Sequence, residues 1–228
     1  MIGNLYIVAT PIGNLGDIGF RAVEILKSAD MILCEDTRVA KKMLARFDIQ
    51  KPLESCHQHS TLQKTDYILG LLGEGKNLAL VSDAGTPGIC DPGNQLVCAA
   101  VEKFVDEIKI IPVPGANAAV AALSVCGFCA DKFVFLGFPP AKNKRKKYFQ
   151  DLLSCEYTAV FYESNFRILK TLAEINELNP DKSRQIIVCR ELTKKFETIY
   201  RGTIAQVIAK IKKTPLKGEF VIVLEAKE

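Results

Sequence analysis

A glycine- and proline-rich stretch decides the fold: VSDAGTPGICDPG, residues 81–93. It follows the apolar run 78–81, which is short enough and apolar enough to be a buried parallel strand. Its three glycines permit close approach of the backbone to a ligand. Asp91 followed by a proline is typical of a helix start and predicts a helix through Phe104. Loops of this kind at the carboxyl end of a parallel strand bind ligands in open α/β sheets.

The chemistry of this loop limits the ligand. No Gly-Lys-Ser/Thr follows it, and it is not Gly-x-Gly-x-x-Gly, so it is neither a P-loop nor a dinucleotide loop. Its charged side chains are Asp83 and Asp91, which would repel a pyrophosphate and suit hydroxyls or positive charge. The alternative is a rigid surface loop whose Asp residues cap backbone N–H groups. The unusual length of the loop favours ligand binding.

Composition sets the broad class. The chain has 228 residues, 48% of them hydrophobic, which suits one or two domains with real cores. A net charge of +4 is compatible with nucleic acid without demanding it. No apolar run reaches membrane-spanning length, and residues 5–9 already read as a strand without a basic segment before them. We therefore expect a cytoplasmic protein with no membrane partner and with reduced thiols.

The cysteines are predicted to be structural. Four of the eight lie in or beside apolar runs, where free Cys packs as a small hydrophobe: Cys34, Cys90, Cys98 and Cys189. Cys126 and Cys129 form a C-x-x-C pair at the end of an Ala-rich helix, where a thiolate gains nothing from the helix dipole. No second pair follows, and His57 and His59 lie at no ligand-like spacing; they could offer a general base but are more often simply solvated. We expect no metal.

Strand and helix patterns alternate in the first half. Strands are expected at residues 5–9, 31–34, 52–56, 78–81 and 108–111. Helices are expected between them, the first carrying Ile18, Ala22, Ile25 and Leu26 at helical spacing, the next ones ending near Leu44, Leu72 and Phe104. Five strands alternating with four helices imply a parallel sheet with helices on both faces.

The character changes at residues 112–115, where two prolines and a glycine break regularity and a small-residue helix, 116–123, follows. Further strands are expected at residues 133–136, 158–162, 185–189, 198–200 and 220–224. Two of these are close enough together, around residues 196–201, for an antiparallel hairpin, which makes this sheet mixed. We expect two α/β domains: residues 1–115 with a parallel sheet and flanking helices, and residues 116–228 with a mixed sheet and helices.

An acidic cluster ends the strand at residues 31–34. Glu35, Asp36 and Arg38 lie there, on the same sheet edge as the loops 10–17 and 82–91. Together these side chains can orient a hydroxyl substrate, or they can form an ordinary capping and ion-pair cluster. Both readings stay open.

A basic run is the strongest nucleic-acid signal. Its members are Lys142, Lys144, Arg145, Lys146 and Lys147, followed by Tyr148 and Phe149. Positive charge followed by aromatics suits phosphate contacts and base stacking. The alternative is a solvated helix start with its aromatics turned to the core. Because a cationic N-terminus opposes the helix dipole, the charge favours nucleic acid.

Two further clusters follow strands of the second half. FYES at residues 161–164 ends one strand, with Ser164 a candidate helix cap. RELTKK at residues 190–195 occupies the matching place after another.

Six stretches carry a resemblance: residues 5–15, 35–38, 81–87, 161–164, 190–194 and 217–219. In this order, and over essentially the whole chain, they are similar to ribosomal RNA methyltransferases of the tetrapyrrole (corrin/porphyrin) methylase family. The resemblance implies an S-adenosylmethionine-dependent 2′-O-methyltransferase acting on a cytidine ribose of 16S rRNA, free or in the assembled small subunit. It also implies a homodimer of two-domain subunits with the cofactor folded between the domains.

The resemblance also implies cofactor contacts: Pro11, Asp83, Ala84, Thr86, Asn117, Ala118, Tyr162, Glu163, Leu192, Gly218 and Glu219. An acidic, lysine-free pocket agrees with a cofactor that carries a sulfonium and an ammonium and no phosphate. The expected chemistry is in-line attack of the ribose 2′-oxygen on the methyl group. Glu35 or Asp36 is the predicted base, and Arg38 the predicted anchor for an RNA phosphate.

One departure and two alternatives accompany the resemblance. Similar proteins often continue into a small helical region, whereas this sequence stops at Glu228, so RNA affinity is expected to depend more on the basic run and the dimer. The first alternative is a tetrapyrrole (precorrin or uroporphyrinogen) C-methyltransferase, which would have no use for the basic run. The second is a non-catalytic RNA-binding module.

Overall fold

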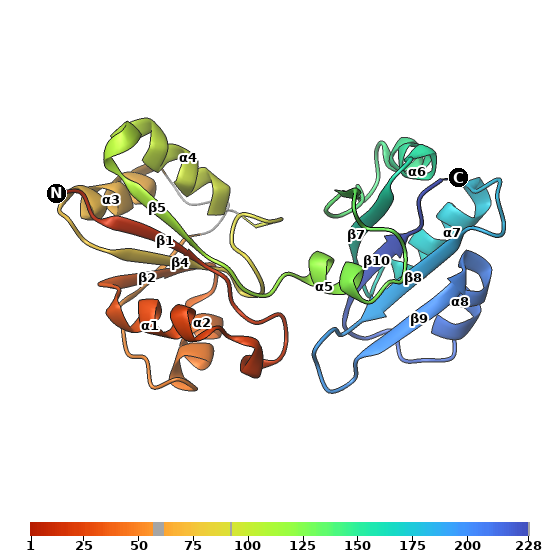
Figure 1. Cartoon of the computed structure of the whole chain (residues 1–228), viewed down its shortest axis with the longest axis horizontal. Coiled ribbons are helices and arrows are strands. Elements are labelled where there is room, and N and C mark those ends of the chain that lie inside the picture. Colours follow the sequence, from red (N-terminus) through yellow and green to blue (C-terminus); the bar gives the residue numbers. More distant parts are fainter. Residues whose placement is uncertain (57–61, 92, 228) are drawn as a thin grey trace. The chain divides into compact units, whose positions relative to one another are not determined.

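The computed structural model describes residues 1–56, 62–91 and 93–227, and the chain forms two compact units, Met1–Asn117 and Ala118–Glu228 (Figure 1). Each unit has its own sheet and its own hydrophobic core. No helix of the described residues is long and apolar enough to cross a membrane.

The first unit contains the predicted parallel sheet. Its strands are β1 (Asn4–Val8), β2 (Met31–Cys34), β3 (Leu53–Ser55), β4 (Leu78–Val81) and β5 (Lys109–Val113). They lie in the order β3-β2-β4-β1-β5, and all the pairs are parallel. All four residues of β4 are buried, as its apolar composition requires of a central strand.

Helices cover both faces of this sheet, as predicted (Figure 1). They are α1 (Phe20–Ser28), α2 (Thr37–Ala45), α3 (Leu62–Gly73) and α4 (Gly93–Phe104), with short 3₁₀ turns η1 (Leu15–Asp17) and η2 (Val105–Glu107). Leu26 and Leu44 pack in one core on the α1–α2 side, and Leu72 and Leu96 in another on the α3–α4 side. The helix expected to include Ile18 begins only at Phe20, because η1 closes a separate turn in which the Asn14 side chain accepts a hydrogen bond from Gly16 N.

The break predicted at residues 112–115 begins two residues later than expected, after Val113. β5 continues through Pro112 to Val113, with Pro112 opposite Ile7. β5 is an edge strand, paired to β1 alone, so the proline leaves no ladder hydrogen bond unmade on its open side.

The second unit contains a mixed sheet, also as predicted. Its strands are β6 (Phe133–Phe135), β7 (Thr158–Ser164), β8 (Gln185–Arg190), β9 (Thr198–Thr203) and β10 (Glu219–Leu224). Their order is β6-β7-β10-β8-β9, with β6 parallel to β7 and every other pair antiparallel. The predicted hairpin is β8–β9, in which Cys189 lies opposite Ile199.

Four helices complete this unit: α5 (Ala118–Ser124), α6 (Arg145–Ser154), α7 (Ile168–Leu178) and α8 (Ile204–Ile211). Phe149 and Phe161 are fully buried in its core, and burying one such side chain contributes about 1.5–3 kcal/mol. Ser164 does not cap α7, since it is the last residue of β7 and the N-cap position belongs to Arg167.

Candidate functional site

Loops from β1 and β4 are joined at the carboxyl edge of the first sheet. Thr10 N donates to Gly85 O at 2.8 Å, and Gly85 N donates back to Thr10 O at 3.1 Å. The Thr10 hydroxyl, itself buried, donates to Ser82 O at 3.0 Å. Gly85 has φ +83°, a conformation that favours glycine. The predicted convergence of these two loops is confirmed, and it fixes the glycine loop against the first strand.

Hydrogen bonds also order the rest of the glycine loop. Asp91 Oδ1 accepts from Gly93 N at 3.1 Å and from Gly88 N, so Asp91 has the capping role that was the alternative to ligand binding. Thr86 Oγ1 donates to Ala116 O at 3.1 Å, which ties the loop to the segment after β5. The loop is therefore a stiff structure that presents Asp83 and Ala84, both exposed, at this edge.

The other predicted cofactor residues of this unit are Pro11, Thr86 and Asn117. Pro11 follows Thr10 and is buried, and Thr86 and Asn117 are half-buried. The predicted residue Ala118, also half-buried, begins α5 and belongs to the second unit.

Asp36 and Arg38 form a capping and ion-pair arrangement. Asp36 is the N-cap of α2, and its Oδ1 accepts from Arg38 N at 2.8 Å. The Arg38 guanidinium donates to the same carboxylate, with Nη2 2.6 Å from Oδ2. These bonds lower the pKa of Asp36 to about 2, and the hydrogen bond from the Arg38 guanidinium contributes most. Such a carboxylate is a weak proton acceptor.

Glu35 and Asp83 differ from Asp36 in their hydrogen-bond partners and in the direction of their pKa shifts. Glu35 Oε1 accepts from Asp83 N at 3.4 Å, and Asp83 Oδ1 accepts from Asp36 N at 3.3 Å. Within the described residues no Lys or Arg forms an ion pair with Glu35 or Asp83. Burial raises the pKa of both carboxyls, and the charges of Asp91 and Asp83 raise that of Glu35 further. Glu35 is thus the stronger candidate base of the predicted pair.

A second convergence occurs in the other unit, where β7 and β8 end and β10 begins. Glu219 lies opposite Ser164, and Phe220 lies opposite both Glu163 and Arg190. Because β10 is antiparallel to both neighbours, the ends of β7 and β8 share one edge with its start. This edge holds the remaining predicted cofactor residues: Tyr162, Glu163, Leu192, Gly218 and Glu219.

The loop after β8 packs tightly against the start of β10. Glu191 N donates to Glu219 O at 2.9 Å, and Glu219 N donates to Glu191 Oε1 at 3.0 Å. Lys194 Nζ bridges the two carboxylates at 3.0 and 2.8 Å. Gly218 has φ +109°, and a Cβ there would lie 2.4 Å from the Glu191 side chain. Only glycine fits this close approach.

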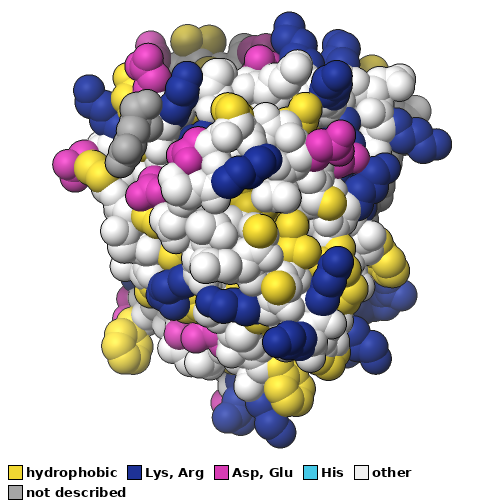
Figure 2. All heavy atoms as spheres, turned by 90° about the vertical axis from the view of Figure 1, so that its right-hand side faces the viewer, with side chains coloured by type: hydrophobic (Ala, Val, Ile, Leu, Met, Phe, Trp, Pro, Cys, Tyr) yellow, Lys and Arg dark blue, Asp and Glu magenta, His cyan; other side chains and the backbone are white. Residues whose placement is uncertain are grey.

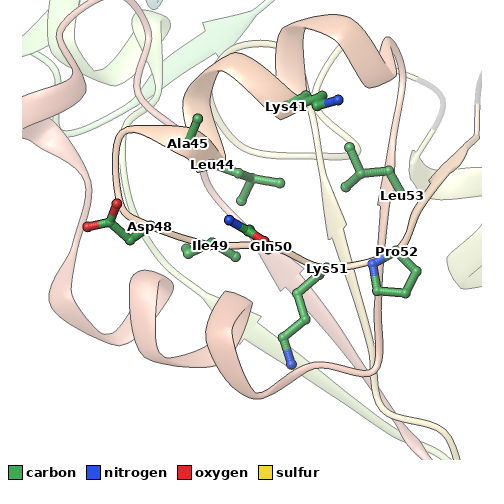
Figure 3. A pocket seen from close by; sticks show the side chains of 9 residues that line it. All are labelled: Lys41, Leu44, Ala45, Asp48, Ile49, Gln50, Lys51, Pro52 and Leu53. Carbon is green, nitrogen blue, oxygen red and sulfur yellow. The ribbon is translucent and has the colours of Figure 1, made fainter.

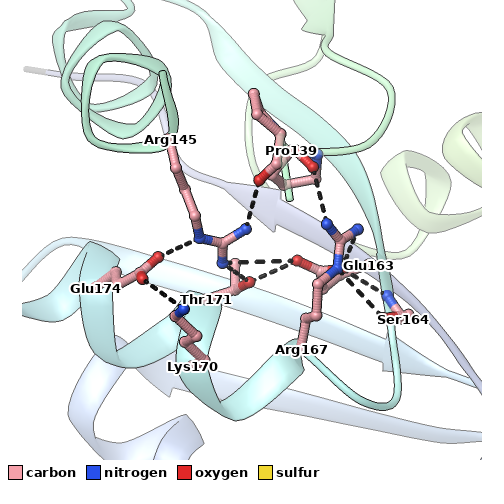
Figure 4. Close-up of polar contacts among 9 residues, drawn as sticks. Pro139, Arg145, Glu163, Ser164, Arg167, Lys170, Thr171 and Glu174 are labelled. Atoms are coloured by element: carbon pink, nitrogen blue, oxygen red, sulfur yellow. Dashed lines mark hydrogen bonds and ion pairs between the residues drawn. The ribbon is translucent and has the colours of Figure 1, made fainter. Parts of the chain in front are cut away.

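The Glu163 side chain is fully occupied by protein partners (Figure 4). Its Oε1 accepts from Ser164 N at 2.7 Å and pairs with Arg167 Nη2 at 2.8 Å. Its Oε2 accepts from Thr171 Oγ1 at 2.5 Å. Glu163 is 2% exposed. Any cofactor contact of this residue is therefore left to its main chain.

Thr193 is a residue that the sequence reasoning missed. Its hydroxyl is buried and has no hydrogen-bond partner among the described residues. Glu191 and Thr193 both have positive φ, +53° and +65°, so the turn is held in an uncommon conformation. An unpaired buried hydroxyl costs about 1–3 kcal/mol, which makes it a signal for a ligand. In the sequence, only its place within residues 190–194 pointed to it.

The structure divides the basic run. Lys142, Lys144, Lys146 and Lys147 are exposed. Arg145 is 6% exposed, donates to Pro140 O and Glu174, and lies 4.9 Å from the Phe149 ring centre. Its guanidinium is therefore occupied by protein partners, and we leave Arg145 out of the RNA contacts proposed below. Phe149 is likewise in the core, so its aromatic ring cannot stack on a base.

The cysteines match the prediction only in part. Cys34 and Cys189 are buried, and burial raises their pKa values to about 11 and about 12. Cys90 and Cys98 are exposed, against the prediction, because Cys90 lies in the glycine loop and Cys98 faces Glu102 one turn further along α4. Cys126 is buried, and its sulfur accepts from Phe128 N. His57 and His59 lie outside the described residues. Within the described ranges, no group of three or more His, Cys, Asp or Glu could hold a metal ion.

The described residues of the first unit line two cavities that bear on the site. One of about 650 Å³ is lined by the end of α2 and the segment leading into β3, with Lys41, Asp48 and Lys51 on its walls (Figure 3). It is at the amino end of β3, opposite the edge that carries Glu35. The other, of about 320 Å³, lies under the glycine loop and is lined by apolar residues including Ile7, Leu80 and Val97. Neither contains the acidic cluster.

Comparison with known proteins identifies the family of this chain. The family model "Tetrapyrrole (Corrin/Porphyrin) Methylases" matches residues 4–208. A Synechocystis protein named ribosomal RNA small subunit methyltransferase I is 46% identical over 98% of this chain and 79% of its own length. A Bacillus subtilis protein of the same name is 44% identical over 98% of this chain and 75% of its own.

Solved structures share the fold. A cobalt precorrin-4 methyltransferase superposes with a TM-score of 0.72 at 19% identity, covering 97% of this chain and 94% of that one. A diphthine synthase gives 0.75 at 14% identity, covering 98% and 90%. At these identities the likeness shows the fold alone, whereas the family model and the relatives above 40% identity show descent. The chain belongs to the tetrapyrrole (corrin/porphyrin) methylases.

Proposed function

We propose that this protein transfers a methyl group from S-adenosylmethionine to the ribose 2′-oxygen of a cytidine in the 16S RNA of the small ribosomal subunit. The relatives that are 42–46% identical over nearly the whole chain carry the name of a small-subunit ribosomal RNA methyltransferase. The observation that carries the ribose chemistry is Glu35, a half-buried carboxyl whose pKa is raised and which has no cation among the described residues.

The residues present fit the proposed cofactor. Glu35, Asp83 and Asp91 give the first strand-end edge a negative character that suits a sulfonium and an ammonium. The unpaired Thr193 hydroxyl offers a hydrogen bond in the second unit. When bound, S-adenosylmethionine supplies a methyl group activated by the positive sulfur. We propose as contacts the predicted residues together with Thr193: Pro11, Asp83, Ala84, Thr86, Asn117, Ala118, Tyr162, Glu163 (main chain), Leu192, Gly218 and Glu219.

Glu35 is proposed to take the proton of the 2′-hydroxyl. A ribose hydroxyl is weakly acidic, so a base with a raised pKa assists it more than an ordinary carboxylate. Asp36 is proposed to position Arg38 and not to accept a proton, because its pKa is about 2 and its oxygens bind the Arg38 guanidinium. The Arg38 side chain remains 86% exposed while it is held in this way, so it can meet an RNA phosphate.

RNA is proposed to meet the exposed lysines of the basic run as well: Lys142, Lys144, Lys146 and Lys147. We also propose that the protein works as a homodimer in the cytoplasm, on free 16S RNA or on the assembled subunit.

The test is methyl transfer from labelled S-adenosylmethionine to small subunits that lack the modification, followed by alkaline hydrolysis of the RNA. A 2′-O-methyl group removes the nucleophile that alkali needs, so the proposal predicts one missing rung, at a cytidine. Label in RNA with a complete ladder would move the methyl group to a base. No transfer to any RNA, with transfer to a precorrin or uroporphyrinogen instead, would show the tetrapyrrole activity of the same fold. Cofactor binding without transfer to either substrate would leave a non-catalytic RNA-binding module.

A further inference from the structure

Two exposed phenylalanines lie close to the basic run. Phe138 precedes it in the chain, and the residue after Phe166 is hydrogen-bonded to the segment that leads into it. Phe138 is 53% exposed and Phe166 is 91% exposed. Scattered exposed apolar side chains are ordinary in soluble proteins, so exposure alone means little. The sequence offered Phe149 for base stacking, but Phe149 is buried. Phe138 and Phe166 are exposed rings near the basic run, so they can take that role instead.

The segments that carry these two rings are joined by a hydrogen-bonded arginine (Figure 4). Arg167 Nη1 donates to Pro139 O at 3.1 Å, while its Nη2 pairs with Glu163 at 2.8 Å. Phe138 directly precedes Pro139, and Phe166 directly precedes Arg167. Arg167 thus links the backbone beside Phe138 to the residue that follows Phe166.

The Phe138 ring is also supported from one side. It packs edge-on against Tyr162, with ring centres 5.4 Å apart, and Tyr162 packs in turn against Phe135 at 5.0 Å. The same ring remains half-exposed. An aromatic ring that is held on one side and open on the other is what base stacking needs.

Lysines follow Phe138 on the same segment. Arg145 anchors the end of this segment by donating to Pro140 O at 2.9 Å and to Glu174 at 2.5 Å. Lys142 and Lys144 lie between these anchored residues and are exposed. Neither forms an ion pair within the described part of the chain. Residues 138–150 contain no Asp or Glu, so the positive charge of the segment is not neutralised locally.

We propose that Phe138 and Phe166, together with Lys142 and Lys144, form a stacking surface for unpaired nucleotides of the substrate RNA. The proposal rests on the proposed function and names how its RNA is held. The rings would stack on bases of any identity, and the lysines would contact the phosphates between them.

Unpaired RNA fits this surface better than a second copy of the chain does. In a two-fold dimer the same patch meets itself, which would bring these lysines toward like charges. Figure 2 shows the side of the molecule on which α7 and α8 lie, where Lys and Arg side chains are spread among hydrophobic ones without forming one continuous field. Charge alone therefore does not mark an RNA path on that face, and a local combination of rings and lysines is the more specific signal.

The experiment measures binding of a fluorescent single-stranded RNA to the full chain by anisotropy over a range of salt concentrations. The variants are Phe138→Ala, Phe166→Ala and their double. Phe196→Ala is the matched control, because Phe196 is 65% exposed in the same unit and also lies beside a lysine. We expect each ring to contribute roughly tenfold in Kd, with the salt slope unchanged. Lys142→Ala and Lys144→Ala should instead each lower the slope by about 0.7.

An RNA of the same length with abasic sites separates stacking from other effects. Wild type should bind it more weakly than intact RNA, and the double Phe variant should bind both RNAs alike. The proposal is overturned if the double variant keeps the wild-type Kd, if it loses equally on abasic RNA, or if it loses a dimer that wild type forms. The melting temperature excludes misfolding: we expect Phe166→Ala, at a side chain that is 91% exposed, to melt as wild type does, and Phe138→Ala to melt slightly lower because it loses the edge-on contact with Tyr162.

Activity on small subunits distinguishes this proposal from the proposed function. If wild type transfers no methyl group while the rings still control RNA affinity, the proposed function fails and the stacking surface stands. If wild type methylates the subunit and the double variant has the same KM and Kd for RNA, the stacking surface alone fails.

Discussion

Two carboxylates at the first strand-end edge of this protein, Glu35 and Asp83, differ in their partners from the carboxylates at the second edge. At the first edge, Glu35 and Asp83 have no cationic partner among the described residues, and burial raises the pKa of each. At the second, Glu163 pairs with Arg167, and Glu191 and Glu219 share Lys194. Acidic residues are thus used differently at the two edges: the paired carboxylates hold loops in place, whereas Glu35 is the group for which we propose a role in proton transfer.

The difference also sets what each edge does to stability. A carboxyl whose pKa is raised in the folded state favours folding below its ordinary pKa and loses that contribution as pH rises. Glu35 therefore opposes folding at neutral pH, which is common for groups that a site retains for function. Glu163 acts through its ion pairs, because replacing it leaves the buried Arg145 and the partly buried Arg167 without this carboxylate, which costs stability.

The largest expected effect comes from neutralising the unpaired edge. Glu35→Gln should lower the rate of methyl transfer at saturating RNA by about 10²–10⁴-fold, the usual contribution of a general base. Cofactor affinity should stay near that of wild type, as measured by calorimetry. Asp36→Asn is the matched control and should lose much less, since the carboxylate it removes is a helix cap held by Arg38. An equal loss in the two variants would contradict the assignment of the base to Glu35.

Breaking the paired edge should chiefly affect stability. Glu163→Gln leaves Arg167 and the buried Arg145 without their shared carboxylate and should lower the free energy of unfolding by about 3–5 kcal/mol. Glu219→Gln at the exposed end of the same edge should change it by less than about 1 kcal/mol. Chemical denaturation measures both. Equal, small changes would mean that the Glu163 network is not what holds β7 to α6 and α7.

Thr193→Val should have a smaller effect, confined to the cofactor. Valine keeps the shape of threonine and removes the buried hydroxyl that has no partner among the described residues. Without cofactor, stability should stay the same or rise. Affinity for S-adenosylmethionine should fall by about fivefold to tenfold, which corresponds to roughly 1 kcal/mol for one hydrogen bond. Unchanged cofactor affinity together with lower stability would assign Thr193 a purely structural role.

The smallest expected effect concerns pH and the surface pair. The Arg38 guanidinium holds the pKa of Asp36 at about 2, below its ordinary 3.8. The contribution of this cap to stability is therefore present above pH 3.8 and is lost as pH falls toward 2. In Asp36→Asn the melting temperature should depend less on pH across that window than in wild type. An unchanged pH dependence would mean that the pair does not persist in solution.

Local sequence patterns were enough to predict the helices and strands and the class of each sheet. Alternating apolar runs and helical spacing indicated five strands and four helices in the first unit, and the short span between residues 189 and 198 indicated a hairpin. The strand order β3-β2-β4-β1-β5 did not follow from these patterns, since neighbours in the sheet are not neighbours in the chain. The strand was expected to end before Pro112 for the same reason. Only the strand order shows that β5 is an edge strand, where a proline is tolerated.

At the candidate site, the sequence indicated which sheet edge carries the acidic residues, but it could not say which of Glu35 and Asp36 would be the base. Glu35 and Asp36 are adjacent and chemically alike, and only the position of Arg38 and the capping geometry separate their pKa values. Arg145 looked like one more cation of a basic run, because its partner Glu174 is on another helix. Thr193 was indicated only by its place within residues 190–194, since an unpaired hydroxyl is a property of the folded turn.

The central claim is that the unpaired carboxyl of Glu35 performs the proton transfer. The most direct measurement is the single-turnover rate of methyl transfer to small subunits as a function of pH, for wild type and Glu35→Gln. We predict that the wild-type rate falls on the acid side with a pKa above the ordinary 4.5 of a glutamic acid, and that this fall is absent from the variant. The same acid limb in both proteins, with similar rates, would contradict the claim.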